Sequence, residues 1–170
     1  STHHDSQRTR PTTTQLCRVA FAGAFFLLLL FGCINPANAA SYTFPGNLPM
    51  GCTGSAGAYT CTALTLIAGD TLTIGVPTPA TLTINGNLNT GGASVNAPGN
   101  PSNLRLVVTG MLTAGSGARI TADVTAGSVS NVAGGATVNG SITTKTGAIG
   151  LGSNTSVSGG ITSDSGTVNV

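Results

Sequence analysis

The last third of the chain repeats a short pattern of apolar residues, glycine and threonine about every nineteen residues. Residues 138–143 (VNGSIT) return nineteen positions later as residues 157–162 (VSGGIT). An upstream copy occupies residues 120–125 (ITADVT), and weaker copies begin at Ile84 and Val108. A fixed period of about 20 residues is typical of solenoids, in which each repeat forms one coil and cannot bury its apolar face alone.

Apolar side chains alternate with Thr, Ser or Asn within each repeat. In a strand this alternation sends Val, Ile and Leu to one face and the polar residues to the other, while Gly accommodates tight corners. At about nineteen residues per coil, the segment from Leu64 to Val170 provides five to six coils. We therefore predict that residues 64–170 form an all-β domain, a right-handed parallel β-helix.

Two other fold classes were weighed against the solenoid. A helical fold is excluded because no stretch after residue 39 has a 3.6-residue apolar stripe, and Thr, Gly, Asn and Val are poor helix formers. A β-sandwich also uses short strands and frequent turns, but it does not predict near-copies at a nineteen-residue offset. Residues 89–103 (NTGGASVNAPGNPSN) break the period, and we expect them to form a loop that protrudes from one corner.

The N-terminal part of the chain has the features of an export signal. An apolar run covers residues 19–34, arginines precede it, and the pattern Ala37-x-Ala39 follows it. We predict that residues 1–39 are a helical signal peptide with a polar lead, cleaved between Ala39 and Ala40. The run of about 16 residues is short for a membrane-spanning helix, so an uncleaved anchor is the weaker interpretation.

Lipidation is an alternative fate for the N-terminal segment. Residues 30–33 (LFGC) resemble a bacterial lipobox, in which Cys33 would carry the lipid and become the new N-terminus. Phe31 is unusual for such a motif, where small or medium side chains are the rule. Cleavage after Ala39 is the preferred prediction.

The charges of the chain divide at the predicted cleavage site. Three arginines precede the apolar run: Arg8, Arg10 and Arg18. Residues 40–170 contain three cations and three anions: Arg105, Arg119, Lys145, Asp70, Asp123 and Asp164. Since this part is formally neutral and has no Trp, it lacks the basic surplus and the stacking surfaces of nucleic-acid-binding proteins. We expect no nucleic-acid partner, and membrane contact only through the signal segment.

Two cysteines remain after the predicted cleavage. Cys52 and Cys61 are nine positions apart, and an exported pair of this kind can oxidise. The chain-entropy model gives such a short loop about 2–3 kcal/mol of stabilisation. A metal or redox site is the competing interpretation, but it needs further ligands or a C-x-x-C spacing, and neither His nor Glu occurs after residue 39. We predict a disulfide that pins an N-terminal cap over residues 40–63.

Parallel β-helices also occur among polysaccharide lyases and hydrolases, so an enzyme must be considered. Cleavage of a glycosidic bond needs two nearby carboxylates, or carboxylates with Ca²⁺ and a base. Asp70, Asp123 and Asp164 fall on different coils of the predicted solenoid, and we expect them at three separate surface positions. The Gly-rich segments match neither a phosphate-binding loop nor a Ca²⁺-binding nonapeptide. We therefore expect no catalytic, cofactor or metal site.

Several segments of the chain resemble the N-terminal region of MshQ-type proteins. They are residues 47–55 (NLPMGCTGS), 59–62 (YTCT), 64–74 (LTLIAGDTLTI) and 146–149 (TGAI). Such proteins are exported and are associated with biogenesis of the mannose-sensitive haemagglutinin (type IV) pilus in Gram-negative bacteria. They are usually far longer than this chain, and their large downstream domains have no counterpart here.

The sequence predicts a non-catalytic solenoid that is exported to the periplasm, the outer surface or the medium, with a structural, adhesive or pilus-associated role. Its partner would be a surface or pilus component. The chain ends in mid-strand at residues 168–170 (VNV), which we interpret as truncation. An open edge that pairs end to end with another copy is the alternative, as in a self-assembling, bactofilin-like scaffold. A polysaccharide-active enzyme is the third hypothesis.

Overall fold

The computed structural model describes residues 38–75, 77–128 and 130–170. The predicted signal helix and Cys33 lie outside these residues. The described part contains nineteen β-strands and one short 3₁₀ helix, η1 (Pro101–Asn103). Across these three ranges, no helix has the length and apolarity needed to cross a membrane.

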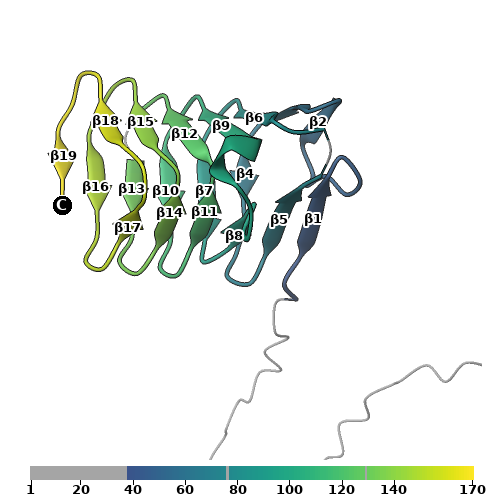
Figure 1. Ribbon diagram of the computed structural model, residues 1–170, viewed down its shortest axis with the longest axis horizontal. Helices are drawn as coiled ribbons and strands as arrows, with labels where there is room; N and C mark the ends of the chain where they lie inside the picture. Colours follow the sequence, from purple (N-terminus) through teal and green to yellow (C-terminus); the bar gives the residue numbers. More distant parts are fainter. Residues whose placement is uncertain (1–37, 76, 129) are drawn as a thin grey trace, which may run out of the picture. The chain divides into compact units, whose positions relative to one another are not determined.

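The strands form three sheets that run along the stack of coils (Figure 1). Sheet A consists of β1 (Ser41–Phe44), β5 (Thr71–Ile74), β8 (Ser94–Val95), β11 (Arg119–Thr121), β14 (Thr137–Asn139) and β17 (Ser156–Val157). Sheet B consists of β2 (Cys52–Ser55), β3 (Ala58–Cys61), β6 (Ala80–Ile84), β9 (Leu104–Val108), β12 (Asp123–Ala126), β15 (Ile142–Thr144) and β18 (Ile161–Ser163). Sheet C consists of β4 (Leu64–Thr65), β7 (Leu88–Gly91), β10 (Leu112–Ala114), β13 (Ser130–Val132), β16 (Ile149–Leu151) and β19 (Val168–Asn169).

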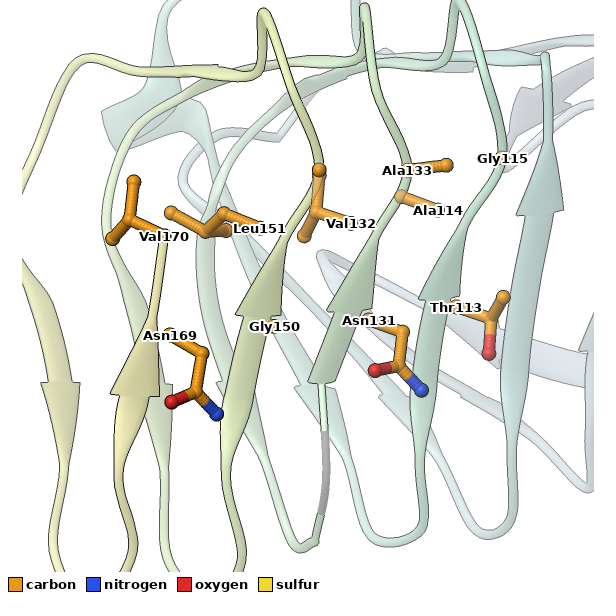
Figure 2. Close-up of a pocket in the computed structure, with 11 residues that line it drawn as sticks. Thr113, Ala114, Gly115, Asn131, Val132, Ala133, Gly150, Leu151, Asn169 and Val170 are labelled. Carbon is orange, nitrogen blue, oxygen red and sulfur yellow. The ribbon is translucent and has the colours of Figure 1, made fainter.

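Each coil contributes one strand to each sheet, and every neighbouring pair is parallel except β2–β3. This arrangement confirms the predicted parallel β-helix. It has six coils, and the first begins with β1 at Ser41, whereas the sequence count began at Leu64. The strands of sheet C lie side by side in Figure 2, with Thr113, Asn131 and Asn169 at equivalent positions.

The length of a coil differs between the two halves of the stack. From Arg105 to its partner Asp123 is 18 residues, and from Asn131 to its partner Gly150 is 19, close to the predicted period. From Thr81 to its partner Arg105, however, is 24 residues. The extra residues of the early coils do not shift the strands, because they are confined to the corners.

The corner between sheet A and sheet B holds most of these extra residues. In the first three coils it contains residues 45–57, 75–79 and 96–103, which include β2 and η1. In the last three coils the same corner needs only Ala122, residues 140–141 and residues 158–160. We call the three long connections the corner loops.

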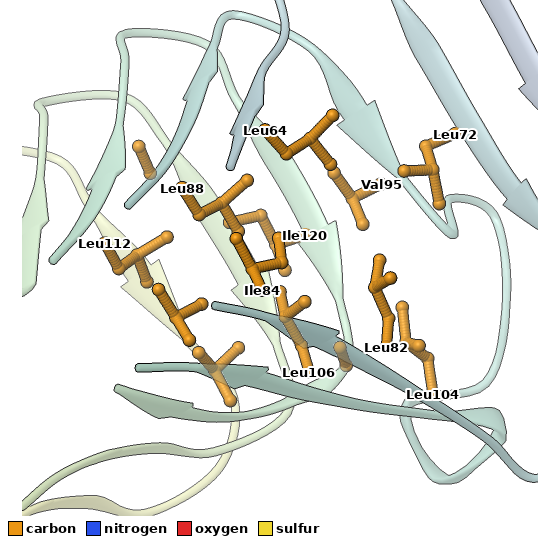
Figure 3. Packing of buried hydrophobic residues seen from close by; sticks show 14 of the residues in the cluster. Leu64, Leu72, Leu82, Ile84, Leu88, Val95, Leu104, Leu106, Leu112 and Ile120 are labelled. Carbon is orange, nitrogen blue, oxygen red and sulfur yellow. The ribbon is translucent and has the colours of Figure 1, made fainter. Parts of the chain in front are cut away.

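The core is made of columns of inward side chains, one column for each position of a strand (Figure 3). In sheet B the column through the middle of the strands contains Tyr59, Leu82, Leu106, Val124, Ile142 and Ile161. Leu82, Leu106 and Ile142 are completely buried. Burial of each such side chain contributes about 1.5–3 kcal/mol, so the column stabilises a stack whose single coils could not fold alone.

An aromatic pair lies at the beginning of the core. Phe44 of β1 and Tyr59 of β3 are buried, and their rings meet edge to face with centroids 4.9 Å apart. Both residues belong to the region predicted as a separate cap over 40–63. That boundary is wrong, because β1 pairs with β5 and β3 pairs with β6 in the parallel sheets. Only residues 45–57 form an addition to the first coil.

The predicted loop over residues 89–103 is only partly a loop. Residues 88–91 form β7 and residues 94–95 form β8, and only residues 96–103 leave the coil. The Gly91-Gly92 pair suggested a turn, but Thr90, Ala93 and Val95 alternate inward and are buried. Small inward side chains therefore continue the coil where the composition resembles that of a loop.

Candidate interaction surface

The three aspartates predicted at separate positions are on three different coils. Asp123 begins β12 in the fourth coil, Asp164 follows β18 in the sixth, and Asp70 precedes β5 in the second. Asp123 and Asp164 are exposed as expected, but Asp70 is buried, so its predicted surface position is wrong. The structure does not bring these carboxylates together.

Asp123 is held by the next coil. Its Oδ1 accepts hydrogen bonds from the Ser141 hydroxyl at 2.7 Å and from the Ser141 amide N–H at 3.0 Å. These two bonds, the hydroxyl bond first, lower the pKa of the Asp123 carboxyl because they favour its charged form. Arg105 is the partner of Asp123 in the parallel ladder, so opposite charges occupy adjacent strands on the outer face of sheet B.

Asp70 has a different environment, which the sequence did not indicate. Its Oδ2 accepts a hydrogen bond from the Ile67 amide N–H at 2.9 Å, and its Oδ1 accepts one from the Ala40 amide N–H at 2.7 Å. The first bond closes a tight turn within the chain. The second joins the start of the first coil to the second coil.

The predicted disulfide is present between Cys52 and Cys61. The two residues are opposite each other in the antiparallel β2–β3 pair, with their Cα atoms 4.0 Å apart. The β2–β3 hairpin covers the outer edge of β3, which would otherwise be the first strand of sheet B. The disulfide therefore fixes an element that protects a sheet edge.

The outer face of sheet B has a column of threonines. Outward positions in successive strands are paired one above another, and five of the six carry threonine: Thr60, Thr83, Val107, Thr125, Thr143 and Thr162. All six side chains are half-buried or exposed. Since parallel strands are about 4.8 Å apart, the column presents a methyl and a hydroxyl group at that regular spacing. We call it the threonine column.

A groove lies beside the third corner loop. Ala97, Pro98 and Gly99 of this loop form one wall, and the outer face of sheet A forms the other. The groove has a volume of about 320 Å³, and the exposed side chains of Arg119, Thr137 and Asn139 line it. We call it the corner groove. It offers a cation, hydroxyl and amide groups, and an apolar proline side by side.

The loop that forms this wall is held in place by two asparagines. Asn96 is buried, and its Nδ2 donates to the carbonyl of Thr121 in the next coil at 2.9 Å. Asn100 caps η1, because its Oδ1 accepts from the Ser102 amide N–H at 3.0 Å. The loop is therefore preorganised, which reduces the entropy lost on binding a partner.

A second groove runs across the outer face of sheet C (Figure 2). It has a volume of about 440 Å³ and follows four coils, with Thr113, Asn131, Gly150 and Asn169 at equivalent positions. Gly150 leaves a gap between two asparagines. No titratable side chain lines this groove among the described residues, whereas Arg119 lines the corner groove.

The described residues do not form a metal centre. Nowhere among them do three or more His, Cys, Asp or Glu side chains come together. The surfaces described above are suited to contacts by hydrogen bonding and shape. The threonine column was visible in the sequence as the Thr that follows each repeat, but the corner groove joins distant segments and left no local signal.

Comparison of the chain with family models, with curated proteins and with solved structures gives no match. The resemblance to MshQ-type proteins therefore stays a prediction from the quoted motifs.

Proposed function

We propose that this chain is an exported, non-catalytic module of the bacterial cell surface, with a structural, adhesive or pilus-associated role. The observation that carries the proposal is the stack of six coils in register, with its core inside and uncharged polar columns outside. Such a stack is a stiff body, because each coil is hydrogen-bonded to its neighbours along all three sheets. A stiff, neutral body suits a spacer that presents a binding surface.

The disulfide supports the exported location. Disulfides persist in oxidising compartments, and Cys52–Cys61 closes the hairpin at the edge of the stack. The signal predicted over residues 1–39 and the localisation in the periplasm, on the outer surface or in the medium of a Gram-negative bacterium belong to the same proposal.

Export is tested by fusing residues 1–39, and separately residues 1–170, to alkaline phosphatase, which is active only after export. Both fusions should give phosphatase activity in a Gram-negative host. A matched fusion that starts at Ala40 should be inactive. Activity of the Ala40 fusion equal to that of the other two, or inactivity of all three, would reject the exported location.

The corner groove is the surface that we propose for recognition of a surface or pilus partner. It combines the one cation of sheet A, Arg119, with an ordered loop, and loops held on rigid scaffolds are frequent binding sites. The partner expected from this lining is a polar protein or glycan surface with an anionic group opposite Arg119.

Binding is tested with labelled 40–170 protein on piliated cells and on isogenic cells without pili. The variants are Arg119→Gln and Thr137→Val, with Asn131→Ala on sheet C as the matched control. We expect Arg119→Gln to reduce binding about tenfold, the usual loss for one charge-assisted contact. Binding of Arg119→Gln equal to that of the wild type would reject the corner groove, and equal binding to both cell types would reject the pilus as partner.

Self-assembly is a second candidate function, favoured by the sixth coil. Its inward Val157 and Ile161 are half-buried, and Val168 is 41% exposed, whereas the corresponding residues of the middle coils are fully buried. A second copy stacked on β17, β18 and β19 would cover them. Sedimentation of 40–170 protein as a monomer at all concentrations would reject end-to-end assembly, whereas concentration-dependent filaments would support it.

A further inference from the structure

Asp70 has no function in the proposed binding surface, and yet it is the one buried carboxylate of the described residues. Its side chain is only 4% exposed. Both hydrogen-bond donors to its carboxylate are neutral amide groups of the backbone, at Ile67 and Ala40. Burial of a carboxylate is costly unless a positive charge compensates it. The environment of Asp70 therefore lacks the partner that its burial calls for.

One of the two donors is at a special place in the chain. The nitrogen of Ala40 belongs to the peptide bond that the sequence predicts as the signal cleavage site, and it lies 2.7 Å from Asp70 Oδ1. Ala40 is also held from its other side, because its carbonyl accepts a hydrogen bond from the Thr71 amide N–H at 2.9 Å. Its position in the first coil is therefore fixed by the second coil.

We propose that cleavage between Ala39 and Ala40 supplies the missing cation. Hydrolysis breaks the Ala39–Ala40 peptide bond, and water adds a hydroxyl to the Ala39 carbonyl carbon and a hydrogen to the Ala40 nitrogen. The resulting amine takes up a proton at neutral pH and becomes an ammonium group. The same nitrogen then forms an ion pair with Asp70, which ties the mature N-terminus to the second coil.

Removal of the preceding residues does not disturb the fold. Asn38 and Ala39 are exposed, and the first buried apolar side chain is Phe44 of β1. Ala39 only lies over the turn before Asp70, where a Cβ on Gly69 would be 3.2 Å from the Ala39 Cβ. Its departure leaves room for the two additional hydrogens of the ammonium group.

The cleavage site itself is tested first, since the inference rests on the proposed export. The full 1–170 chain is produced in a Gram-negative host, and the exported protein is analysed by intact mass spectrometry and N-terminal sequencing. We expect a chain that starts at Ala40 with a free α-amino group. A start at any other residue, including a lipidated Cys33, would overturn the inference while leaving export itself supported.

The ion pair is tested with chains that differ by one native residue. The 40–170 chain places its ammonium group at Asp70, whereas the 39–170 chain keeps an amide there and moves the charge one residue outward. We expect the unfolding temperature of 39–170 to be about 3–6 °C lower, the shift that a contact of this kind produces in a domain of this size. In the Asp70→Asn background the two chains should unfold at the same temperature, and Asp164→Asn should retain the full difference.

A second measurement serves if Asp70→Asn does not fold. The α-amino group of native 40–170 should react with an amine-specific reagent about tenfold more slowly than that of 39–170, because an ion-paired ammonium group must first lose its partner. The exposed Lys145 provides the internal reference for reagent activity. Equal labelling rates, or a 39–170 chain as stable as 40–170, would overturn the ion pair.

Discussion

Asp123 shows how a single exposed side chain can connect neighbouring coils. The Ser141 bonds lower its pKa, so the folded state holds the charged form more strongly than the unfolded state does. This contribution is complete above the ordinary Asp pKa of about 3.9 and is lost as the pH falls through the lower pKa of the folded state.

We therefore predict that Asp123→Asn loses stability at pH 7 but little at pH 3. The measurement is the urea midpoint of the variant and of the wild type between pH 3 and pH 7. Ser141→Ala, which removes the hydroxyl donor, should reduce the pH dependence of the wild type in the same direction. A constant difference between Asp123→Asn and wild type over this range would contradict the prediction.

Thr90 offers a second test at the scale of one residue. Its side chain is completely buried, and its hydroxyl has no hydrogen-bond partner among the described residues. Thr90→Val has nearly the same shape and removes the unpaired hydroxyl, so we expect it to raise the free energy of unfolding by about 1 kcal/mol. The measurement is urea denaturation, with the outward Thr83→Val as the control, which should change it much less. A loss of stability in Thr90→Val would mean that the hydroxyl has a partner.

The sequence distinguished some of these residues and not others. The cysteine pair could be predicted because its spacing and context left few alternatives. Asp70 could not be separated from Asp164, because both follow a Gly- or Ser-rich turn and only the fold brings the Ala40 nitrogen to one of them. Burial of a lone charge depends on contacts thirty residues apart, which no local pattern records.

Corner glycines decide how closely successive coils can stack. A Cβ on Gly115 would lie 2.5 Å from the Gly91 carbonyl oxygen and 2.6 Å from its carbonyl carbon, so the backbone would have to move. Gly160 has no atom within 4 Å of the same position. Neither residue has a positive φ, so the two differ in space and not in backbone strain.

Gly115→Ala should therefore lower the free energy of unfolding by about 1–3 kcal/mol, the usual cost of overpacking. Gly160→Ala should have an effect within about 0.5 kcal/mol. Both values come from urea denaturation of the 40–170 chain. Equal losses in the two variants would show that close packing at the corners is not what requires glycine.

At the scale of strands, the repeat predicted the coils well where they are 18–19 residues long. It failed for the strands β7 and β8, because Gly-Gly and Asn made this segment resemble a loop although its inward residues are buried. The boundary at residue 63 failed for a related reason. The first coil contains the hairpin, which hides its period, and only strand pairing shows that Tyr59 stacks on Leu82.

For the whole molecule, register predicts which deletions the stack tolerates. Ser141 lies above Asp123, eighteen residues apart, so removal of residues 123–140 takes out one complete coil and joins Ala122 to Ser141. All three sheets keep their pairing, and we expect a folded protein whose circular dichroism per residue is unchanged and whose unfolding stays cooperative.

Removal of residues 123–136 is the matched control, because it is shorter by four residues and places later strands out of register. Its inward and outward side chains no longer align, so this variant should not fold. The same outcome for both deletions would contradict a stack that depends on register.

The corner between sheets A and B turns with a single residue in the fourth coil and with eight in the third, and the strands on either side remain aligned. Chain length at this corner is thus independent of the rest of the architecture. An epitope or enzyme tag inserted beside the exposed Pro98 and Gly99 would be carried outside the stack, which makes this corner a natural grafting position for display on the protein.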